Sequence, residues 1–304
     1  MAENEEAGGD KPSKVKSALV MTAAVLTIGA TIAGLLADSI SVVKEATEES
    51  ELSAAVVAKQ TAVVGLLAGF GDPPPPKDCL ANVETQLDAL IKAATPLKDG
   101  KADSKRPQDA AAVNALTEFT KAHPDQGVGF GLLAKAQLYN GVAGTEVAKN
   151  AKVADTLCDK WALPSNLVGI THFRGGRSDD AEVSYRTALG RHPAYAAPRF
   201  NLALIALRKK DAGAAVEELT TLIGHHPHHK NAHLLRGQAY LQLNKTAEAL
   251  VDLKAAVAAD GKNANAQLLL GQALAKSGDA AGAKKALCTA KSLGHPAGAQ
   301  VCPE

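Results

Sequence analysis

A 34-residue repeat decides the fold of this chain, and its first copy is residues 162–195, ALPSNLVGITHFRGGRSDDAEVSYRTALGRHPAY. The repeat occurs four times between Ala162 and Ala297. Small residues mark its first half and alanines mark its second half, one period apart: Gly169, Ala203, Gly237 and Gly271, then Ala181, Ala215, Ala249 and Ala283. A fixed period of this length is typical of proteins built from stacked structural repeats.

Each repeat has the pattern of a helical hairpin. In the second half an alanine is followed by a large apolar residue and then by Ala or Leu, as in Ala181, Tyr185 and Ala188. This i, i+4, i+7 spacing places the three side chains on one face of a helix. Helix-breaking or capping residues such as Gly176 and Asp211 separate the halves. The sequence therefore predicts two helices per repeat and an all-α solenoid.

At these positions the sequence resembles the tetratricopeptide repeat (TPR) family. The first repeat supplies these members of the family pattern: Val168-Gly169, His172, Ala181, Tyr185, Ala188 and Pro193. The third supplies Gly237, Tyr240, Ala249, Leu253 and Ala256, with Arg236 in place of the expected leucine. The resemblance implies a helical-hairpin solenoid of four regular TPR repeats over residues 161–298, followed by a C-terminal tail at residues 299–304.

The resemblance also implies a binding surface. In TPR proteins the first helices of successive hairpins line a concave groove that commonly binds an extended or helical peptide. Carried onto this sequence, the groove would be lined by Asn166, Ile170, Phe173, Arg174, Phe200, Leu204, Leu207, Arg208, Asn231, Leu234, Gln238, Gln242, Asn265, Leu268, Gln272 and Lys276. The alternative for each apolar member is a place in the core. The Lys/Asn clamp of chaperone-binding TPR domains is not reproduced.

Arg174 and Arg208 are the strongest candidates for surface contacts, because they hold equivalent positions one repeat apart. Two guanidinium groups on one face suit an acidic or C-terminal peptide segment. The predicted partners are therefore other proteins, recognised through such a segment.

An uncharged stretch, residues 17–37, follows a polar N-terminal tail, residues 1–16. It is long enough to cross a bilayer as a helix. Lysines precede it and acidic residues follow it, which predicts a cytoplasmic N-terminus and extracytoplasmic repeats. A cleaved secretory signal and a buried soluble helix are the alternatives. Gly29 and Ala33 give the anchor a small-residue face that allows self-association.

Residues 38–77 are predicted to hold a membrane-proximal helix and a Pro-rich linker. The stretch 54–70 is apolar but contains Lys59, and a charge at mid-bilayer costs about 2.5–3.5 kcal/mol. We expect a helix packed on the domain, on the membrane surface or on a copy of itself. A second span is the alternative, and it would return the repeats to the cytoplasm. Residues 71–76, GDPPPP, are interpreted as a stiff polyproline spacer.

Residues 78–160 form a region that is predicted to be helical but less regular. The expected helices are Leu80 to Leu97, Ala110 to Ala122, Gly129 to Tyr139 and Thr145 to Cys158. His123-Pro124 ends the second of them, as His192-Pro193 and His226-Pro227 end two repeats. We interpret the region as one or two degenerate TPR-like hairpins that continue the stack, with Trp161 at the joint.

The four cysteines, Cys79, Cys158, Cys288 and Cys302, have no spacing that suits zinc. An even number of cysteines beyond a predicted export segment argues for disulfides. The predicted pairs are Cys288 with Cys302, which would fix the tail over the last repeat, and Cys79 with Cys158. Four unpaired buried thiols are expected instead if the domain is cytoplasmic.

Motifs for catalysis and for cofactors are weak in this sequence. Residues 129–134, GFGLLA, fit a loose dinucleotide fingerprint, but no strand pattern precedes them. No acid–base pair or nucleophile with an orienting partner can be assigned. The net charge of +1 gives no electrostatic case for nucleic acid. The cluster His225–His229, with His233, is the one candidate for a metal site, and an exposed turn is its alternative.

The sequence therefore predicts a non-enzymatic, membrane-anchored TPR scaffold or adaptor without a cofactor. Its groove would bind partner proteins on the extracytoplasmic side, which is the periplasm in a Gram-negative cell. Two alternatives stay open. One is a cytoplasm-facing membrane adaptor, if residues 54–70 also span the bilayer. The other is an envelope protein that handles metal through His225–His229.

Overall fold

The computed structural model describes residues 61 and 64 and the ranges 71–81, 86–94 and 107–297. All of these residues belong to one compact unit of the chain, residues 53–304. Every element of regular structure in these ranges is an α-helix, which confirms the all-α prediction. None of the described helices is both long and apolar enough to cross a membrane. The predicted anchor, residues 17–37, lies outside the described residues.

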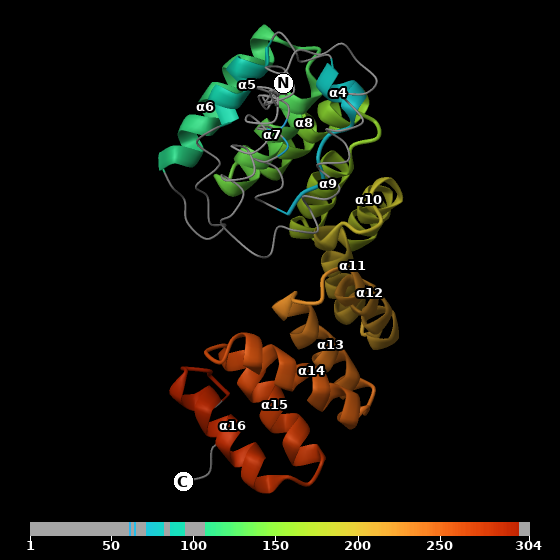
Figure 1. The fold of residues 1–304 in the computed structure, drawn as a ribbon, viewed down its shortest axis with the longest axis vertical. Coiled ribbons are helices and arrows are strands. Elements are labelled where there is room, and N and C mark those ends of the chain that lie inside the picture. Colours follow the sequence, from blue (N-terminus) through green and yellow to red (C-terminus); the bar gives the residue numbers. More distant parts are fainter. Residues whose placement is uncertain (1–60, 62–63, 65–70, 82–85, 95–106, 298–304) are drawn as a thin grey trace, which may run out of the picture. The chain divides into compact units, whose positions relative to one another are not determined.

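Five helical hairpins follow one another from residue 127 onwards (Figure 1). We call the odd-numbered members first helices and the even-numbered members second helices. Their bounds are α7 Gly127–Tyr139, α8 Gly144–Leu157, α9 Ala162–Arg174, α10 Ser178–Arg191, α11 Ala196–Arg208, α12 Ala212–His225, α13 Lys230–Gln242, α14 Thr246–Ala259, α15 Ala264–Lys276 and α16 Ala280–Ser292. From α9 onwards the first helices begin 34 residues apart, at 162, 196, 230 and 264. The period of the sequence is therefore the period of the hairpins.

The hairpin of α7 and α8 keeps this register although its sequence is irregular. α8 begins at Gly144, and 178 − 144 = 34, the spacing of the regular repeats. The turn between α7 and α8 has one residue more than the turn between α9 and α10, 140–143 against 175–177. α7 therefore begins one residue earlier than the 34-residue period requires. This shift hides its relation to the regular repeats when the sequence is compared with itself at a spacing of 34 residues.

Three further helices precede the hairpins: α4 Lys77–Ala81, α5 Leu87–Ala94 and α6 Pro107–Ala122. The sequence predicted a single helix from Leu80 to Leu97, and that prediction is wrong because α4 ends at Ala81 and α5 begins at Leu87. The two helices have different neighbours, since α4 contacts α7 whereas α5 packs on α6.

Small residues on the first helices let the second helices approach closely. A Cβ atom added to Gly169 would lie 2.5 Å from Cε1 of Tyr185. The equivalent atom on Gly237 would lie 2.7 Å from Cγ of Leu253. No side chain fits at such distances, so these positions are the points where the two helices of a hairpin touch.

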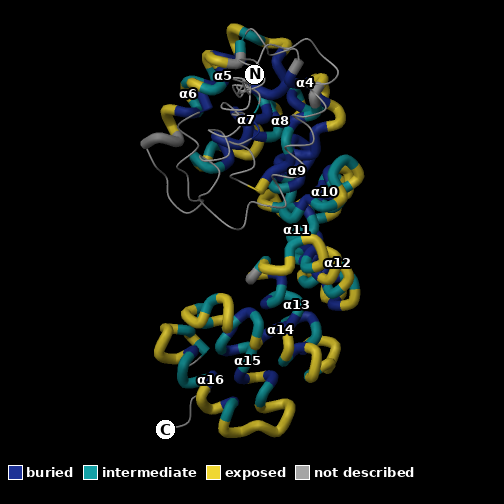
Figure 2. Tube along the Cα trace, viewed as in Figure 1, coloured by how far each residue is buried: buried dark blue, intermediate teal, exposed yellow. Residues whose placement is uncertain are grey.

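The largest part of the core lies at α7 and α9, where buried residues predominate in Figure 2, and α8 contributes Val147 and Ala151 to it. Val64, from the apolar stretch 54–70, is 3% exposed and belongs to this core together with Leu80 and Leu90. The segment 71–76 belongs to the same region, because Asp72, Pro73 and Pro75 are buried. The polyproline composition suggested a spacer, but these residues pack against the domain instead.

Candidate protein-binding face

The sixteen residues predicted to line the groove are here called the first-helix face. Seven of them are exposed: Arg174, Arg208, Asn231, Gln242, Asn265, Gln272 and Lys276. Six are partly buried: Ile170, Phe173, Phe200, Leu204, Leu207 and Gln238. The remaining three, Asn166, Leu234 and Leu268, are buried. Leu234 and Leu268 thus lie in the core, as their apolar side chains favour.

Two residues that were predicted to line the groove, from successive repeats, are in contact on this face. Cζ of Arg208, at the end of α11, lies 4.3 Å from the centre of the Phe173 ring on α9. A guanidinium at this distance from an aromatic ring is held by a cation–π contact. Arg208 is exposed, so its N–H donors stay accessible to an acceptor. Arg208 is therefore oriented before any ligand arrives.

The face carries only one sign of charge. Its ionised members are Arg174, Arg208 and Lys276, and none of the sixteen residues is acidic. Lys276 donates to the Asn244 amide oxygen at 3.3 Å, which keeps its ammonium group at the end of α15. Amide side chains fill the remaining exposed positions on α13 and α15. The arrangement attracts carboxylates and offers hydrogen bonds to a peptide backbone.

The segment 71–76 covers the surface of α7 and the part of α9 around Asn166, which continues the first-helix face towards the N-terminus. The amide nitrogen of Asn166 donates to the Tyr195 hydroxyl at 2.9 Å, and that hydroxyl donates to Oδ1 of Asp72 at 2.6 Å. The other oxygen of Asp72 pairs with the ammonium group of Lys135. The Trp161 indole N–H donates to the Pro73 carbonyl at 3.0 Å. Asn166 is therefore already engaged within the chain.

Burial shifts the protonation equilibria in this cluster. Desolvation lowers the pKa of Lys135 well below its ordinary range, since its side chain is only 3% exposed. Desolvation likewise raises the pKa of Tyr195, so its hydroxyl stays protonated and donates to Asp72. Sequence reasoning assigned no role to Lys135 or Tyr195, because their partner Asp72 is far away in the sequence.

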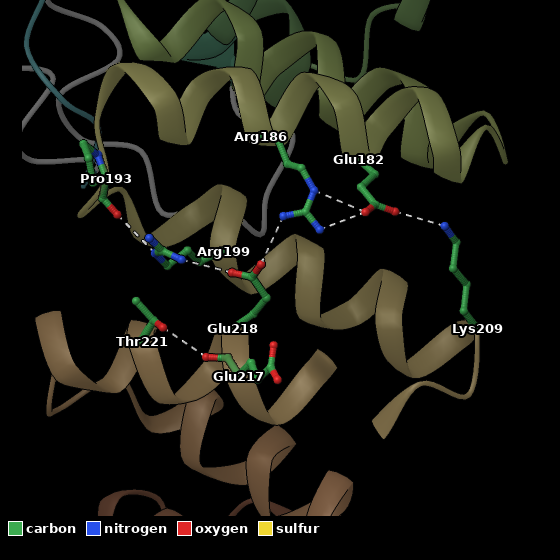
Figure 3. A network of polar contacts seen from close by, with 8 residues as sticks. All are labelled: Glu182, Arg186, Pro193, Arg199, Lys209, Glu217, Glu218 and Thr221. Carbon is green, nitrogen blue, oxygen red and sulfur yellow. Dashed lines mark hydrogen bonds and ion pairs between the residues drawn. The ribbon is translucent and has the colours of Figure 1, made fainter. Parts of the chain in front are cut away.

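A network of ion pairs ties the hairpin of α9 and α10 to the next one (Figure 3). Glu218 on α12 accepts from Arg199 of α11 at 3.1 Å and lies 3.6 Å from Arg186 of α10. Glu182 on α10 accepts from Arg186 at 2.9 Å and from Lys209 at 3.0 Å. Lys209 directly follows Arg208 in the chain. The network therefore also fixes the end of α11, where Arg208 lies.

The histidines of the run have separate partners rather than a common site. His226 Nε2 lies 2.8 Å from the Ala194 carbonyl oxygen, and His229 Nδ1 accepts from the Ala232 N–H at the start of α13. His233 Nδ1 lies 2.9 Å from Oδ1 of the buried Asp252. Across the described ranges no three His, Cys, Asp or Glu side chains gather as metal ligands. The geometry gives the metal alternative no support.

A disulfide joins Cys79 of α4 to Cys158 at the end of α8. It ties the chain that follows the segment 71–76 to the first hairpin. Cys288 on α16 is also disulfide-bonded. Its predicted partner, Cys302, lies outside the described residues.

Comparison with known families identifies the repeats. Residues 169–219, 211–260 and 234–290 each match the tetratricopeptide repeat family. Residues 169–290 are TPR repeats. The resemblance read from the sequence is thereby confirmed for this part of the chain, and so is the helical-hairpin solenoid fold.

Solved structures support the same fold. YrrB, described as a TPR protein with an unusual peptide-binding site, is 15% identical over 60% of this chain and 94% of its own, with a TM-score of 0.53. The type IV pilus biogenesis factor PilW is 15% identical over 67% of this chain and 93% of its own, with a TM-score of 0.57. Cut9–Hcn1 of the APC/C is 13% identical over 81% of this chain and 46% of its own, with a TM-score of 0.59. No curated protein sequence matches this chain.

Proposed function

We propose that this protein is a non-enzymatic scaffold that binds a peptide segment of a partner protein on the first-helix face of α9, α11, α13 and α15. The observation that carries the proposal is the Arg208–Phe173 contact, in which an exposed guanidinium and a partly buried ring from two repeats form one cationic and aromatic site. The peptide-binding site of YrrB supports a role of this kind for a TPR fold.

The chemistry of the face selects an acidic peptide. Carboxylates of the ligand accept from the guanidinium groups of Arg174 and Arg208 in charge-assisted hydrogen bonds. Apolar side chains of the ligand lie on the partly buried Phe173, Phe200 and Leu204. The exposed amides of α13 and α15 bond the backbone of the ligand as it continues along the face. A C-terminal carboxylate supplies the same chemistry as an acidic side chain.

We further propose that residues 17–37 anchor the scaffold in a membrane with the repeats on the extracytoplasmic side. The lysines before this stretch support the orientation. The Cys79–Cys158 disulfide supports an oxidising compartment. Burial of Val64 in the core favours packing of residues 54–70 on the domain over a second span.

Labelled peptides test the binding proposal. The probe is a set of acidic peptides, each paired with a copy in which Asp and Glu are replaced by Asn and Gln. We expect the acidic peptides to bind the wild type, and the variant Arg174→Ala/Arg208→Ala to bind them at least about tenfold more weakly. The measurement is fluorescence anisotropy.

The matched control removes two exposed cations that lie outside the first-helix face, in the variant Arg177→Ala/Lys245→Ala. This control retains wild-type affinity if the face is the binding site. Equal losses in both variants, or equal binding of the acidic and the amide peptides, would show that net charge rather than the face holds the ligand.

A further inference from the structure

Residues 71–76 contact the repeats as a bound peptide would. Gly71 to Pro76 contain no helix or strand, and the segment meets side chains from three successive hairpins. Lys135 on α7 and Tyr195, which directly precedes α11, both contact Asp72. Asn166 on α9 is joined to the segment through the Tyr195 hydroxyl. Trp161, directly before α9, donates to the backbone of the segment at Pro73.

The contacts fall on the same face that is open in the later repeats. Lys135 is the ninth residue of α7, and Ile170, Leu204 and Gln238 hold the ninth positions of α9, α11 and α13. Asn166 is the fifth residue of α9, and Gly131 is the fifth residue of α7. A Cβ on Gly131 would lie 2.2 Å from Cζ3 of Trp161, so this glycine lets the indole lie against α7. The face is therefore continuous, and only its N-terminal part is filled.

The interaction with Asp72 is specific for a carboxylate. Oδ1 accepts from the Tyr195 hydroxyl, and Oδ2 pairs with Lys135. Asp72 is 6% exposed and Lys135 is 2% exposed, so water contributes little to either group. A buried carboxylate and a buried ammonium each need the other, because breaking such a pair leaves an uncompensated buried charge. The prolines add rigidity, since a polyproline segment loses little conformational entropy when it binds.

We infer that the first-helix face of α7 and α9 is a binding site for an extended peptide in which an aspartate precedes prolines, and that the chain fills this site with its own residues 71–76. The Cys79–Cys158 disulfide closes directly behind the segment and holds it in place. External partners are thereby confined to the part of the face that the segment leaves open, from Phe173 and Arg174 at the end of α9 onwards. An Asp-Pro peptide enters the filled part only when the chain's own segment is released.

Trp161 reports directly on this site because it is the only tryptophan in the chain. It is fully buried and bonded to Pro73, so the wild type should show short-wavelength emission and little quenching by acrylamide. The variant Asp72→Asn/Cys79→Ser removes the ion pair and the disulfide but keeps the shape of the aspartate. We expect its emission to shift to longer wavelength and its quenching to increase.

A synthetic peptide with the sequence of residues 71–77, GDPPPPK, should then reverse both changes in trans. It contains no tryptophan and so adds no signal. It must compete with an attached segment whose effective concentration is on the order of millimolar, so it is titrated beyond that range. A peptide with asparagine in place of the aspartate should bind at least about tenfold more weakly.

Three results would overturn the inference: unchanged Trp161 emission in the double variant, no effect of the added peptide, or equal effects of the two peptides. Asp78→Asn is the matched control, because this aspartate is 62% exposed and should leave the emission unchanged. If the double variant loses its cooperative unfolding transition, the single variant Cys79→Ser is used for the test instead. Acrylamide quenching of Trp161 in this variant should exceed that in the wild type and should fall when the Asp peptide is added. Quenching that does not change on addition of the peptide would contradict the inference.

This inference shares with the proposed function only the choice of binding face. The two can fail separately, because Trp161 monitors the contacts of the segment 71–76 whereas the anisotropy experiment depends on Arg174 and Arg208.

Discussion

Single residues decide how closely the helices of each hairpin approach. Gly169 faces the ring of Tyr185, and Gly271 faces Leu287, whose Cδ2 would lie 2.6 Å from an added Cβ. Ala203 takes the same place in the second repeat and is fully buried. The repeat therefore tolerates only a very small side chain where a second helix crosses.

Replacement of Gly169 by Ala should destabilise the protein by about 1–3 kcal/mol, because the new methyl group overlaps the Tyr185 ring. Gly190→Ala is the matched control: this glycine also lies in a helix, α10, but an added Cβ meets nothing within 4 Å. We expect the control to gain about 0.5–1 kcal/mol from helix propensity. Urea unfolding measures the change in the free energy of unfolding for each variant. Changes of the same sign in the two variants would contradict the packing argument.

Tyr195→Phe tests the buried polar cluster. The change removes the hydroxyl that donates to Asp72 and accepts from Asn166, so two buried groups lose a partner. We expect a loss of about 1–3 kcal/mol in the free energy of unfolding. Tyr240→Phe, at a partly buried tyrosine beside Arg236, should cost less. Equal costs in thermal or urea unfolding would mean that the cluster contributes nothing specific.

The sequence pattern predicts exposed positions on the first helices, and it gives no sign of the buried polar cluster, for a physical reason. Arg174 and Arg208 keep one position in a periodic pattern, and both are exposed in the structure. The role of Tyr195 could not be predicted, since its partner Asp72 lies 123 residues away and no local pattern connects the two. Leu234 fits the face by register, but its apolar side chain enters the core instead.

Among the elements, the second helices carry the ion pairs that link neighbouring hairpins. Glu182 on α10 accepts hydrogen bonds from Lys209 and Arg186, and these contacts lower the pKa of its carboxyl from the ordinary value of 4.5, with Lys209 the larger cause. Such a link fixes the rotation of one hairpin against the next. The spacing between Phe173 on α9 and Arg208 on α11 depends on that rotation.

Glu182→Gln should therefore reduce stability at neutral pH by no more than about 1 kcal/mol, because the pair is partly exposed. The folded pKa lies below the unfolded one, so the contribution is present above about pH 4.5 and is lost as the pH falls through the folded pKa. Thermal unfolding of the wild type and the variant should converge in acid. Glu217→Gln, on the surface of α12, is the control, and a Glu182 effect that persists in acid would rule out the ion pair as its cause.

Helices are predicted well where the period is strict and poorly where it is not. The regular hairpins from α9 to α16 follow from the repeat itself. The stretch from Leu80 to Leu97 has an apolar helical pattern, yet it is divided between α4 and α5. The disulfide at Cys79 and the contacts of the segment 71–76 fix α4 separately from α5, and neither constraint is visible in the periodicity.

At the scale of the whole molecule, each hairpin depends mainly on its neighbours. The helices contact chiefly those next to them in the sequence, as in other stacked repeats, so stability is transmitted along the array. The N-terminal end differs, because the segment 71–76 and the disulfide join residues far apart in the chain. The two ends of the repeat array thus differ in what they expose: a closed surface around Lys135 and Asn166, and an open one from Arg174 at the end of α9 onwards.

The proposed membrane topology has a direct test. Protease added to cells stripped of their outer layer should digest the repeats, and alkylation without reducing agent should show blocked thiols. Repeats that are protected, with free thiols, would refute the extracytoplasmic orientation and favour a second span at residues 54–70. An anchorless variant lacking residues 17–37 serves as the control, since it should leave the membrane fraction.

The measurement that tests the central claim most directly is site-specific photocrosslinking in intact cells. A photoreactive residue is placed at Gln242, which is exposed on the first-helix face of α13, and separately at Lys254, which is exposed on the second helix α14. A scaffold that binds partners through its first-helix face should crosslink to a discrete partner from position 242 and not from position 254. Crosslinks from both positions to the same proteins, or from 254 alone, would contradict the assignment of the binding face.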